Sequence, residues 1–208
     1  MKVRGDTKGR IETAALKLFV DKGVAETSIR DIALAVGFSD GALYRHYASK
    51  DELVWCMFKA SFESYAQITA DIAAKEATSR GKIAAMVQNF CNLFDEDSRL
   101  FRFLMLVQHG QLDRVTPDMA NPVETVRSVI ADAMAKGDIP PGDADLATAM
   151  VMGIILQTAT FKVYGRIHQP LGGVGPILAE ACWKTLCVPQ KSPRASPQQS
   201  IASKGLSQ

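Results

Sequence analysis

The residues best suited to specific chemistry gather in one short stretch, residues 26–54. Four side chains there can donate hydrogen bonds to phosphate oxygens: Tyr44, Arg45, His46 and Lys50. A helix start at Thr27 and Ser28 can add backbone N–H groups, and Gly41 lets a ligand approach the backbone closely. Such a set of donors is typical of a nucleic-acid contact. The full set of candidate contact residues is Thr27, Ser28, Ser39, Asp40, Gly41, Ala42, Tyr44, Arg45, His46 and Lys50.

Asp40 differs from the other candidates because its carboxylate repels phosphate. In the major groove of DNA, a carboxylate can instead accept a hydrogen bond from the amino group of cytosine. Asp40 is therefore a candidate for selectivity between DNA sequences. A solvated carboxylate at the start of a helix is the alternative.

The sequence contains no metal-binding or catalytic pattern. The histidines are widely separated and have no partners at metal-ligand spacing: His46, His109 and His168. The cysteines form no C-x-x-C pair and fall within apolar helical patterns: Cys56, Cys91, Cys182 and Cys187. Residues 171–175 (LGGVG) lack the preceding strand and the spacing of a dinucleotide fingerprint. We therefore expect no metal, no cofactor and no enzyme activity, with buried thiols; a redox sensor is the alternative for the cysteines.

Three helix starts follow one another closely around these candidate residues. Ser28 with Asp31 forms a capping box, Ser39 is a second N-cap, and Ser49 with Glu52 forms another capping box. The first helix has one apolar face, made of Ile29, Ile32, Ala33 and Val36, and Gly37 follows where the helix would stop. This succession predicts a helix-turn-helix, in which Ala42, Leu43 and Tyr47 face inward. From the residues alone, a plain helical hairpin with Tyr44 and Tyr47 as core aromatics stays equally open.

A family resemblance favours the helix-turn-helix. The stretch resembles the DNA-binding domain of the TetR family of transcriptional regulators. The matching segments are Thr27-Ser28 to Ile32-Ala33, Gly37-Phe38-Ser39, Gly41 to Tyr47 (GALYRHY), Lys50 to Leu53, and upstream Ala14 to Phe19 with Lys22-Gly23. Tyr47 departs from the family pattern, which has Phe at that position.

The resemblance implies a domain organisation and a mode of action. Residues 1–48 would form the helix-turn-helix domain, and residues 49–187 an effector-binding and dimerisation domain whose connector helix is 49–65. Two chains would pair through 144–166 and 176–187 and hold two recognition helices about 34–36 Å apart on a palindromic operator. A small-molecule effector would then release the DNA, and repression is the commoner outcome in the family. A helical protein-binding adaptor without DNA binding is the alternative, and an enzyme is a more distant one.

The remaining chain also predicts helices, so the expected fold is all-α. An amphipathic helix starts near Ile11, and residues 144–166 form the longest apolar helix. Residues 171–175 are expected to be a loop before the last helix. Residues 1–9 are expected to be a flexible arm that can touch phosphates through Lys2, Arg4 and Lys8, and residues 188–208 a disordered tail.

Aromatic and polar residues of the second half could line an effector pocket. Stripes of this kind are usually core, and the resemblance is what raises the alternative. The candidates are Phe90, Phe94, Phe103, Gln108, His109, Gln157, Phe161 and Tyr164.

The distribution of charge favours a protein whose N-terminal part binds nucleic acid, and we expect the protein to be cytoplasmic. Residues 1–50 carry nine Lys or Arg and six Asp or Glu, whereas residues 51–187 carry twelve and sixteen. The N-terminus has no apolar segment of a signal peptide. The apolar run within 144–166 is interrupted by polar residues, so no membrane span is expected.

Overall fold

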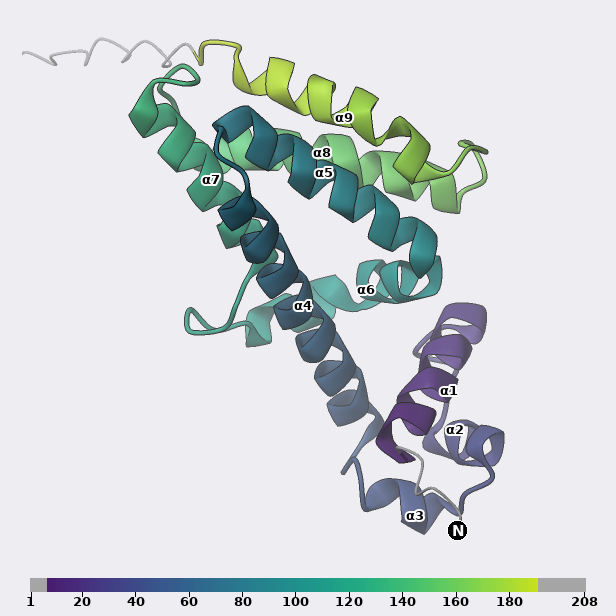
Figure 1. Cartoon of the computed structure of the whole chain (residues 1–208). Helices are drawn as coiled ribbons and strands as arrows, with labels where there is room; N and C mark the ends of the chain where they lie inside the picture. The colour runs from purple at the N-terminus through teal and green to yellow at the C-terminus, as the bar shows by residue number, and fades with distance from the viewer. Residues whose placement is uncertain (1–6, 191–208) are drawn as a thin grey trace, which may run out of the picture.

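The computed structural model describes residues 7–190, and this part of the chain is helical without a strand. The all-α prediction is therefore confirmed. Figure 1 shows a lower group of three short helices and an upper bundle, joined by one long helix. The elements are α1 (Thr7–Lys22), α2 (Ile29–Val36), α3 (Asp40–Tyr44), α4 (Lys50–Lys75), α5 (Ser79–Glu96), α6 (Ser98–Gln111), the 3-10 turn η1 (Leu112–Arg114), α7 (Pro122–Lys136), α8 (Ala144–Val163) and α9 (Leu171–Leu186).

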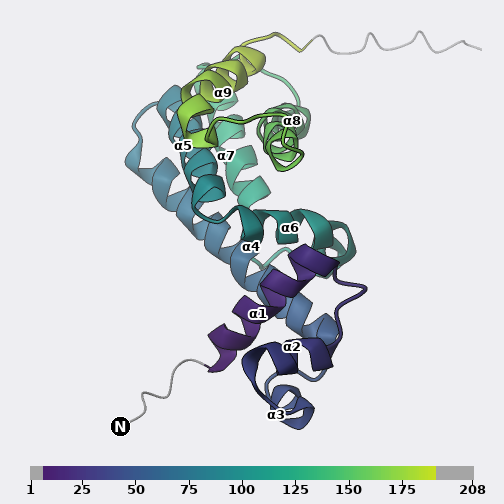
Figure 2. The ribbon, with the colours of Figure 1, turned by 90° about the vertical axis from the view of Figure 1, so that its right-hand side faces the viewer.

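The lower group is a three-helix domain with its own core. Its apolar side chains come mainly from α1 to α3 and the start of α4, and the fully buried ones include Ile11, Phe19, Ile32, Leu43 and Leu53. Helix α6 closes this core from above: the Phe103 ring stacks on Phe19 with centroids 5.8 Å apart. Figure 2 shows α1 lying directly below α6. The helix-turn-helix is thus held against the upper bundle by packed aromatic rings.

Helix α4 connects the two parts. Its 26 residues give a length of about 39 Å. The predicted connector ended at 65, but the helix continues to Lys75. Its C-terminal half packs against α5 and α7, whereas its N-terminal half belongs to the core of the three-helix domain. The same helix therefore contributes to both hydrophobic cores.

The upper bundle is organised around α5 and α9. The sequence predicted a loop at 171–175 and a helix from 176, and this was wrong, because α9 already begins at Leu171. The Asp95 carboxylate of α5 accepts hydrogen bonds from the N–H groups of Leu171 (3.0 Å) and Gly172 (2.8 Å). Pro176 has no N–H to offer the Gly172 carbonyl, and the Gln88 side chain donates to it instead (2.9 Å).

The close packing of α5 and α9 requires a glycine. A Cβ atom at Gly175 would overlap the side-chain amide of Gln88. The glycine-rich start of α9 therefore brings its backbone close to α5. There Asp95 caps the first N–H groups of α9, and Gln88 supplies the donor that Pro176 lacks.

The chain ends differ in part from the predictions. Helix α1 begins at Thr7, so Lys8 is helical rather than part of a flexible arm; Lys2 and Arg4 lie outside the described residues. At the other end, the Gln190 side chain accepts from the Asp143 N–H (2.7 Å). Residues 188–190 are thus placed, and 191–208 lie outside the described residues.

Candidate nucleic-acid interface

Local hydrogen bonds start and stop the two helices of the helix-turn-helix. The Ser28 hydroxyl accepts from the Asp31 N–H (3.1 Å), and the Asp31 carboxylate accepts from the Ser28 N–H (2.8 Å). The hydrogen bonds that the Ser28 N–H and hydroxyl donate to the Asp31 carboxylate hold its pKa below its usual range. Gly37 ends α2 with φ of 74°, a left-handed conformation that suits glycine, and Ser39 then caps α3. The Ser28–Asp31 capping box and the glycine stop predicted from the sequence are confirmed. Ser49 also caps α4 as predicted, but the Glu52 carboxylate accepts from the Ala48 N–H (2.6 Å) instead of completing the box with the Ser49 N–H.

Helix α3 has one buried and one exposed side. Leu43 is fully buried and Tyr47, just beyond the helix, is 2% exposed, so both anchor α3 to the domain core. The other residues of this segment, apart from the half-buried Ala42, are exposed: Asp40, Gly41 and Tyr44 of α3, and Arg45 and His46 just after it. We call Asp40, Gly41 and Tyr44 the α3 face, because they lie within about one quarter of the helix circumference.

Tyr47, which stands where the family pattern has Phe, uses its additional hydroxyl group in a hydrogen bond. Its hydroxyl donates a hydrogen bond to the Glu12 carboxylate of α1 (2.6 Å). Lys8 lies 3.9 Å from the same carboxylate. The added hydroxyl thus ties the end of the α3 region to α1, and it keeps the α3 face in a fixed orientation.

Two predicted contact residues have side chains that are already engaged. Thr27 is fully buried, and its hydroxyl donates to the Gly23 carbonyl (2.8 Å). The Ser28 hydroxyl and N–H both bond Asp31. The side chain of Thr27 cannot reach a ligand, and the N–H of Ser28 is not free for phosphate. Both side chains thus build the helix start, whereas a phosphate contact through the backbone N–H of Thr27 stays a prediction.

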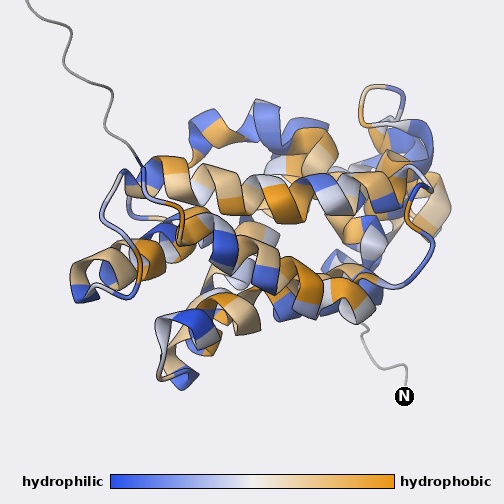
Figure 3. Cartoon of the chain, turned by 90° about the horizontal axis from the view of Figure 1, so that it is seen from above, coloured by the Kyte–Doolittle hydropathy of each residue, from blue (hydrophilic) through white to orange (hydrophobic). Residues whose placement is uncertain are grey.

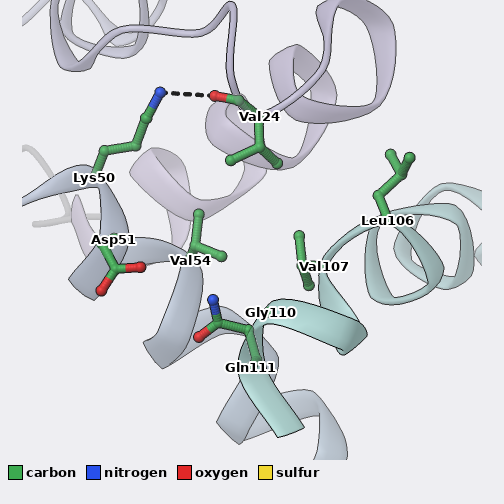
Figure 4. Close-up of a pocket in the computed structure, with 8 residues that line it drawn as sticks. All are labelled: Val24, Lys50, Asp51, Val54, Leu106, Val107, Gly110 and Gln111. Carbon is green, nitrogen blue, oxygen red and sulfur yellow. Dashed lines mark hydrogen bonds between the residues drawn. The ribbon is translucent and has the colours of Figure 1, made fainter. Parts of the chain in front are cut away.

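The prediction that Lys50 contacts phosphate is also corrected. Its Nζ donates to the carbonyl oxygens of Val24 (2.7 Å), Ala25 (3.1 Å) and Thr27 (2.8 Å), and an ammonium group has only three donors. Figure 4 shows Lys50 reaching across from α4 to Val24. Lys50 therefore fixes the α1–α2 loop to the start of α4.

The junction between the two parts of the molecule contains a small cavity. It has a volume of about 260 Å³ and lies between the α1–α2 loop, α4 and α6 (Figure 4). Beside it, Arg114 bonds the Asp51 carboxylate (3.1 Å) and Gln111 (3.2 Å), and its guanidinium lies 4.4 Å from the Trp55 ring centroid. The chain after α6 is thus attached to the first turn of α4.

The predicted effector residues do not come together. Phe103 belongs to the core of the helix-turn-helix domain, so that prediction was wrong. Phe94 is buried beside Phe101, a residue the prediction missed (4.9 Å between ring centroids), and Phe90 packs on the same ring (5.3 Å). Gln108 is half-buried, and four others are exposed: His109, Gln157, Phe161 and Tyr164.

A larger cavity lies elsewhere, between α4, the 116–121 loop and α7. We call it the α4–α7 cavity; its volume is about 650 Å³. Its walls combine small apolar side chains with hydroxyl and amide groups: Ala70, Ala73, Thr116, Pro117, Met119, Asn121, Glu124, Thr125, Ser128 and Val129. None of the predicted effector residues lines it. No sequence pattern marked this set, because its members come from three separate elements.

The cysteines and histidines form no metal site among residues 7–190. Cys91 and Cys182 are buried, and burial raises the pKa of each thiol to about 11. Such thiols are protonated at neutral pH and react slowly. The expectation of buried thiols is wrong for Cys187, which is exposed, and Cys56 is only half-buried.

The fold and the exposed α3 face define a helix-turn-helix protein that contacts DNA. Residues 11–54 match the family model described as "Bacterial regulatory proteins, tetR family". This part of the chain is therefore a DNA-binding domain of the TetR-family type, and the proteins similar to the chain are transcriptional regulators rather than enzymes.

Several known proteins resemble the chain over most of its length. The Fatty acid metabolism regulator protein of Bacillus subtilis is 21% identical over 156 residues, which cover 73% of this chain and 80% of the relative. The transcriptional regulator TtgR of Pseudomonas putida is 27% identical over 158 residues, covering 70% and 74%.

Solved structures show the same fold. The regulator FadR from Bacillus subtilis, in complex with stearoyl-CoA, superimposes with a TM-score of 0.70 at 18% identity and covers 85% of this chain and 98% of its own. The TetR family regulator PfmR from Thermus thermophilus gives 0.68 at 20% identity, covering 84% and 97%.

Proposed function

We propose that this chain is a cytoplasmic repressor that binds a palindromic operator as a homodimer and is released by a small-molecule effector. The observation that carries the proposal is the α3 face. Its polar groups are exposed, while Leu43 and Tyr47 fix the opposite side to a packed core. A recognition helix needs both properties, because its side chains must reach base edges from a rigid support.

The exposed apolar residues of α8 and α9 support a homodimer. Leu146, Phe161 and Tyr164 of the α8 region are 51%, 45% and 70% exposed, and Ile177 of α9 is 69% exposed. By length and composition alone, α8 is apolar enough to cross a membrane. It packs on α7 and α9 within the chain, and a second subunit would cover its remaining apolar surface. In Figure 3, which views the molecule from above, hydrophobic residues (orange) recur along the helices that face the viewer. We therefore assign Gln157, Phe161 and Tyr164 to the dimer surface instead of the effector pocket.

We place the effector in the α4–α7 cavity. Its volume of about 650 Å³ lies within the usual range of small-molecule sites, and its walls offer both apolar surface and hydrogen-bonding groups. Helix α4 forms one wall and also carries Lys50 and Asp51 at the helix-turn-helix. A ligand that prefers one position of α4 would shift the distance between the two recognition helices by its differential affinity. The stearoyl-CoA bound to FadR makes long-chain acyl-CoAs the first compounds to test.

The test is selection of random duplex DNA on the purified protein at two salt concentrations. We expect one enriched palindrome whose binding weakens steeply as salt rises, because phosphate contacts release counterions. Arg45→Ala should weaken binding about tenfold, whereas Lys136→Ala on α7 removes the same charge away from the interface and should not. Failure to enrich any sequence, with and without added cell extract, would contradict the proposal and favour a protein-binding adaptor.

A further inference from the structure

The α3 face carries one carboxylate, Asp40, whose side chain makes no bond within the part of the chain that the structure describes. Other acids at helix starts have partners: Asp31 accepts from the Ser28 N–H (2.8 Å), and Asp143 accepts from the Asp145 N–H (2.8 Å). Helix α3 is capped by the Ser39 hydroxyl, which accepts from the Ala42 N–H (3.3 Å). Within residues 7–190, no hydrogen bond or ion pair involves the Asp40 side chain. An acid in the first turn of a helix is favoured by the helix dipole, but no side-chain contact within these residues specifies one at this position.

The position of Asp40 makes the carboxylate costly for non-specific DNA binding. It is exposed one helical turn before Tyr44, so the two side chains lie on the same face. A Cβ atom built at Gly41 meets nothing within 4 Å, so the space next to Asp40 is open. A carboxylate in this place repels every phosphate that approaches the helix. That repulsion is offset only where a base offers the carboxylate a donor.

The chemistry of the major groove selects one base. Cytosine presents its amino group as a donor without an adjacent acceptor, whereas adenine pairs its amino donor with the N7 acceptor. Guanine presents only acceptors, which repel a carboxylate, and thymine presents an acceptor and a methyl group. We propose that Asp40 reads a cytosine in each half of the operator and disfavours the other bases at that position. This inference rests on the proposed function and adds the identity of one base.

The experiment compares the wild-type protein with Asp40→Asn and Asp40→Ala. Each is put through the random-duplex selection, and its affinity is then measured for the selected operator with each of the four bases at every half-site position. Asp132→Asn is the matched control, because Asp132 is exposed on α7 and its substitution removes the same charge far from α3. Thermal unfolding of all four proteins should differ little, since the Asp40 side chain makes no bond within residues 7–190 and a solvated carboxylate gains only weakly from the helix dipole.

The wild type and Asp132→Asn should prefer cytosine at one position by about tenfold or more. Asp40→Asn should move that preference to adenine, because an amide can bond both N6 and N7. Asp40→Ala should lose discrimination at that position only, and should bind unrelated duplexes more tightly than the wild type does.

The inference is overturned if wild type and Asp40→Ala select the same base at every position, even when the alanine variant binds all duplexes more tightly. In that case the carboxylate acts only by general repulsion. Failure of the proposed function looks different, because the wild type itself would then enrich no palindrome.

Discussion

The α3 face and the exposed surface of α8 and α9 both present side chains without partners among residues 7–190, yet they differ in chemistry. The α3 face presents a carboxylate and a phenol next to the exposed Arg45 and His46. We call the exposed residues Leu146, Phe161, Tyr164 and Ile177 the α8–α9 surface; their side chains are large and mainly apolar. Polar groups are stable in water when free, whereas a contiguous apolar surface gains free energy by being covered.

This difference indicates two kinds of partner. The polar α3 face suits a partner that binds reversibly, such as DNA, because its groups are solvated when the partner is absent. The apolar surface suits a permanent partner, a second subunit. The two surfaces lie toward opposite ends of α4 (Figure 1), so each can be altered without touching the other.

The largest effect is expected when the α8–α9 surface is made charged. The double variant Phe161→Glu, Ile177→Glu should sediment as a monomer and lose about a hundredfold in operator affinity, because each half-site is then bound without its linked partner. Leu106→Glu is the control: Leu106 is 59% exposed on α6 and should leave the dimer intact. A double variant that remains dimeric would contradict the assignment of this surface.

Lys50 tests whether a residue near the DNA end is structural. Lys50→Met leaves three carbonyl oxygens without their charged donor, so unfolding in urea should show a loss of about 2 kcal/mol. The slope of log affinity against log salt should match the wild type, provided the variant stays folded. A slope smaller in magnitude by about 1 would instead show that Lys50 contacts a phosphate.

Tyr47→Phe tests the orientation of the α3 face. The change removes the hydrogen bond to Glu12 and keeps the buried ring, so the free energy of unfolding should fall by about 1 kcal/mol. Operator affinity should fall by a smaller factor than in Arg45→Ala, since the contact residues are intact. Equal stability of the two proteins in urea would show that the hydroxyl contributes nothing.

The smallest effect concerns Asp31 and pH. Its hydrogen bonds to Ser28 lower the pKa of the folded carboxyl, so the stability it contributes is present above the unfolded pKa and is lost as pH falls through the folded pKa. The stability difference between wild type and Asp31→Ala should therefore stay constant down to about pH 5 and shrink as the pH falls below about 4 in thermal unfolding. A constant difference would contradict a role for the ionised form.

The sequence alone determined the local architecture of the helix-turn-helix. The capping box at Ser28, the N-cap at Ser49 and the stop at Gly37 involve residues three or four positions apart, and the structure contains them as predicted. The buried positions Ile32, Leu43 and Tyr47 follow from helical spacing in the same way. Local hydrogen bonds and periodicity need no knowledge of the fold, so they can be read directly.

The contacts between residues far apart in sequence depend on the tertiary structure and were not predicted. Lys50 was expected at phosphate, but it bonds carbonyls 23 to 26 residues away. Helix α9 starts where no local cap exists, because Asp95 supplies one from 76 residues away. Phe103, expected in a ligand pocket, stacks on Phe19 of the first helix. Such contacts depend on how whole helices pack against one another, and the pattern along one helix does not specify that arrangement.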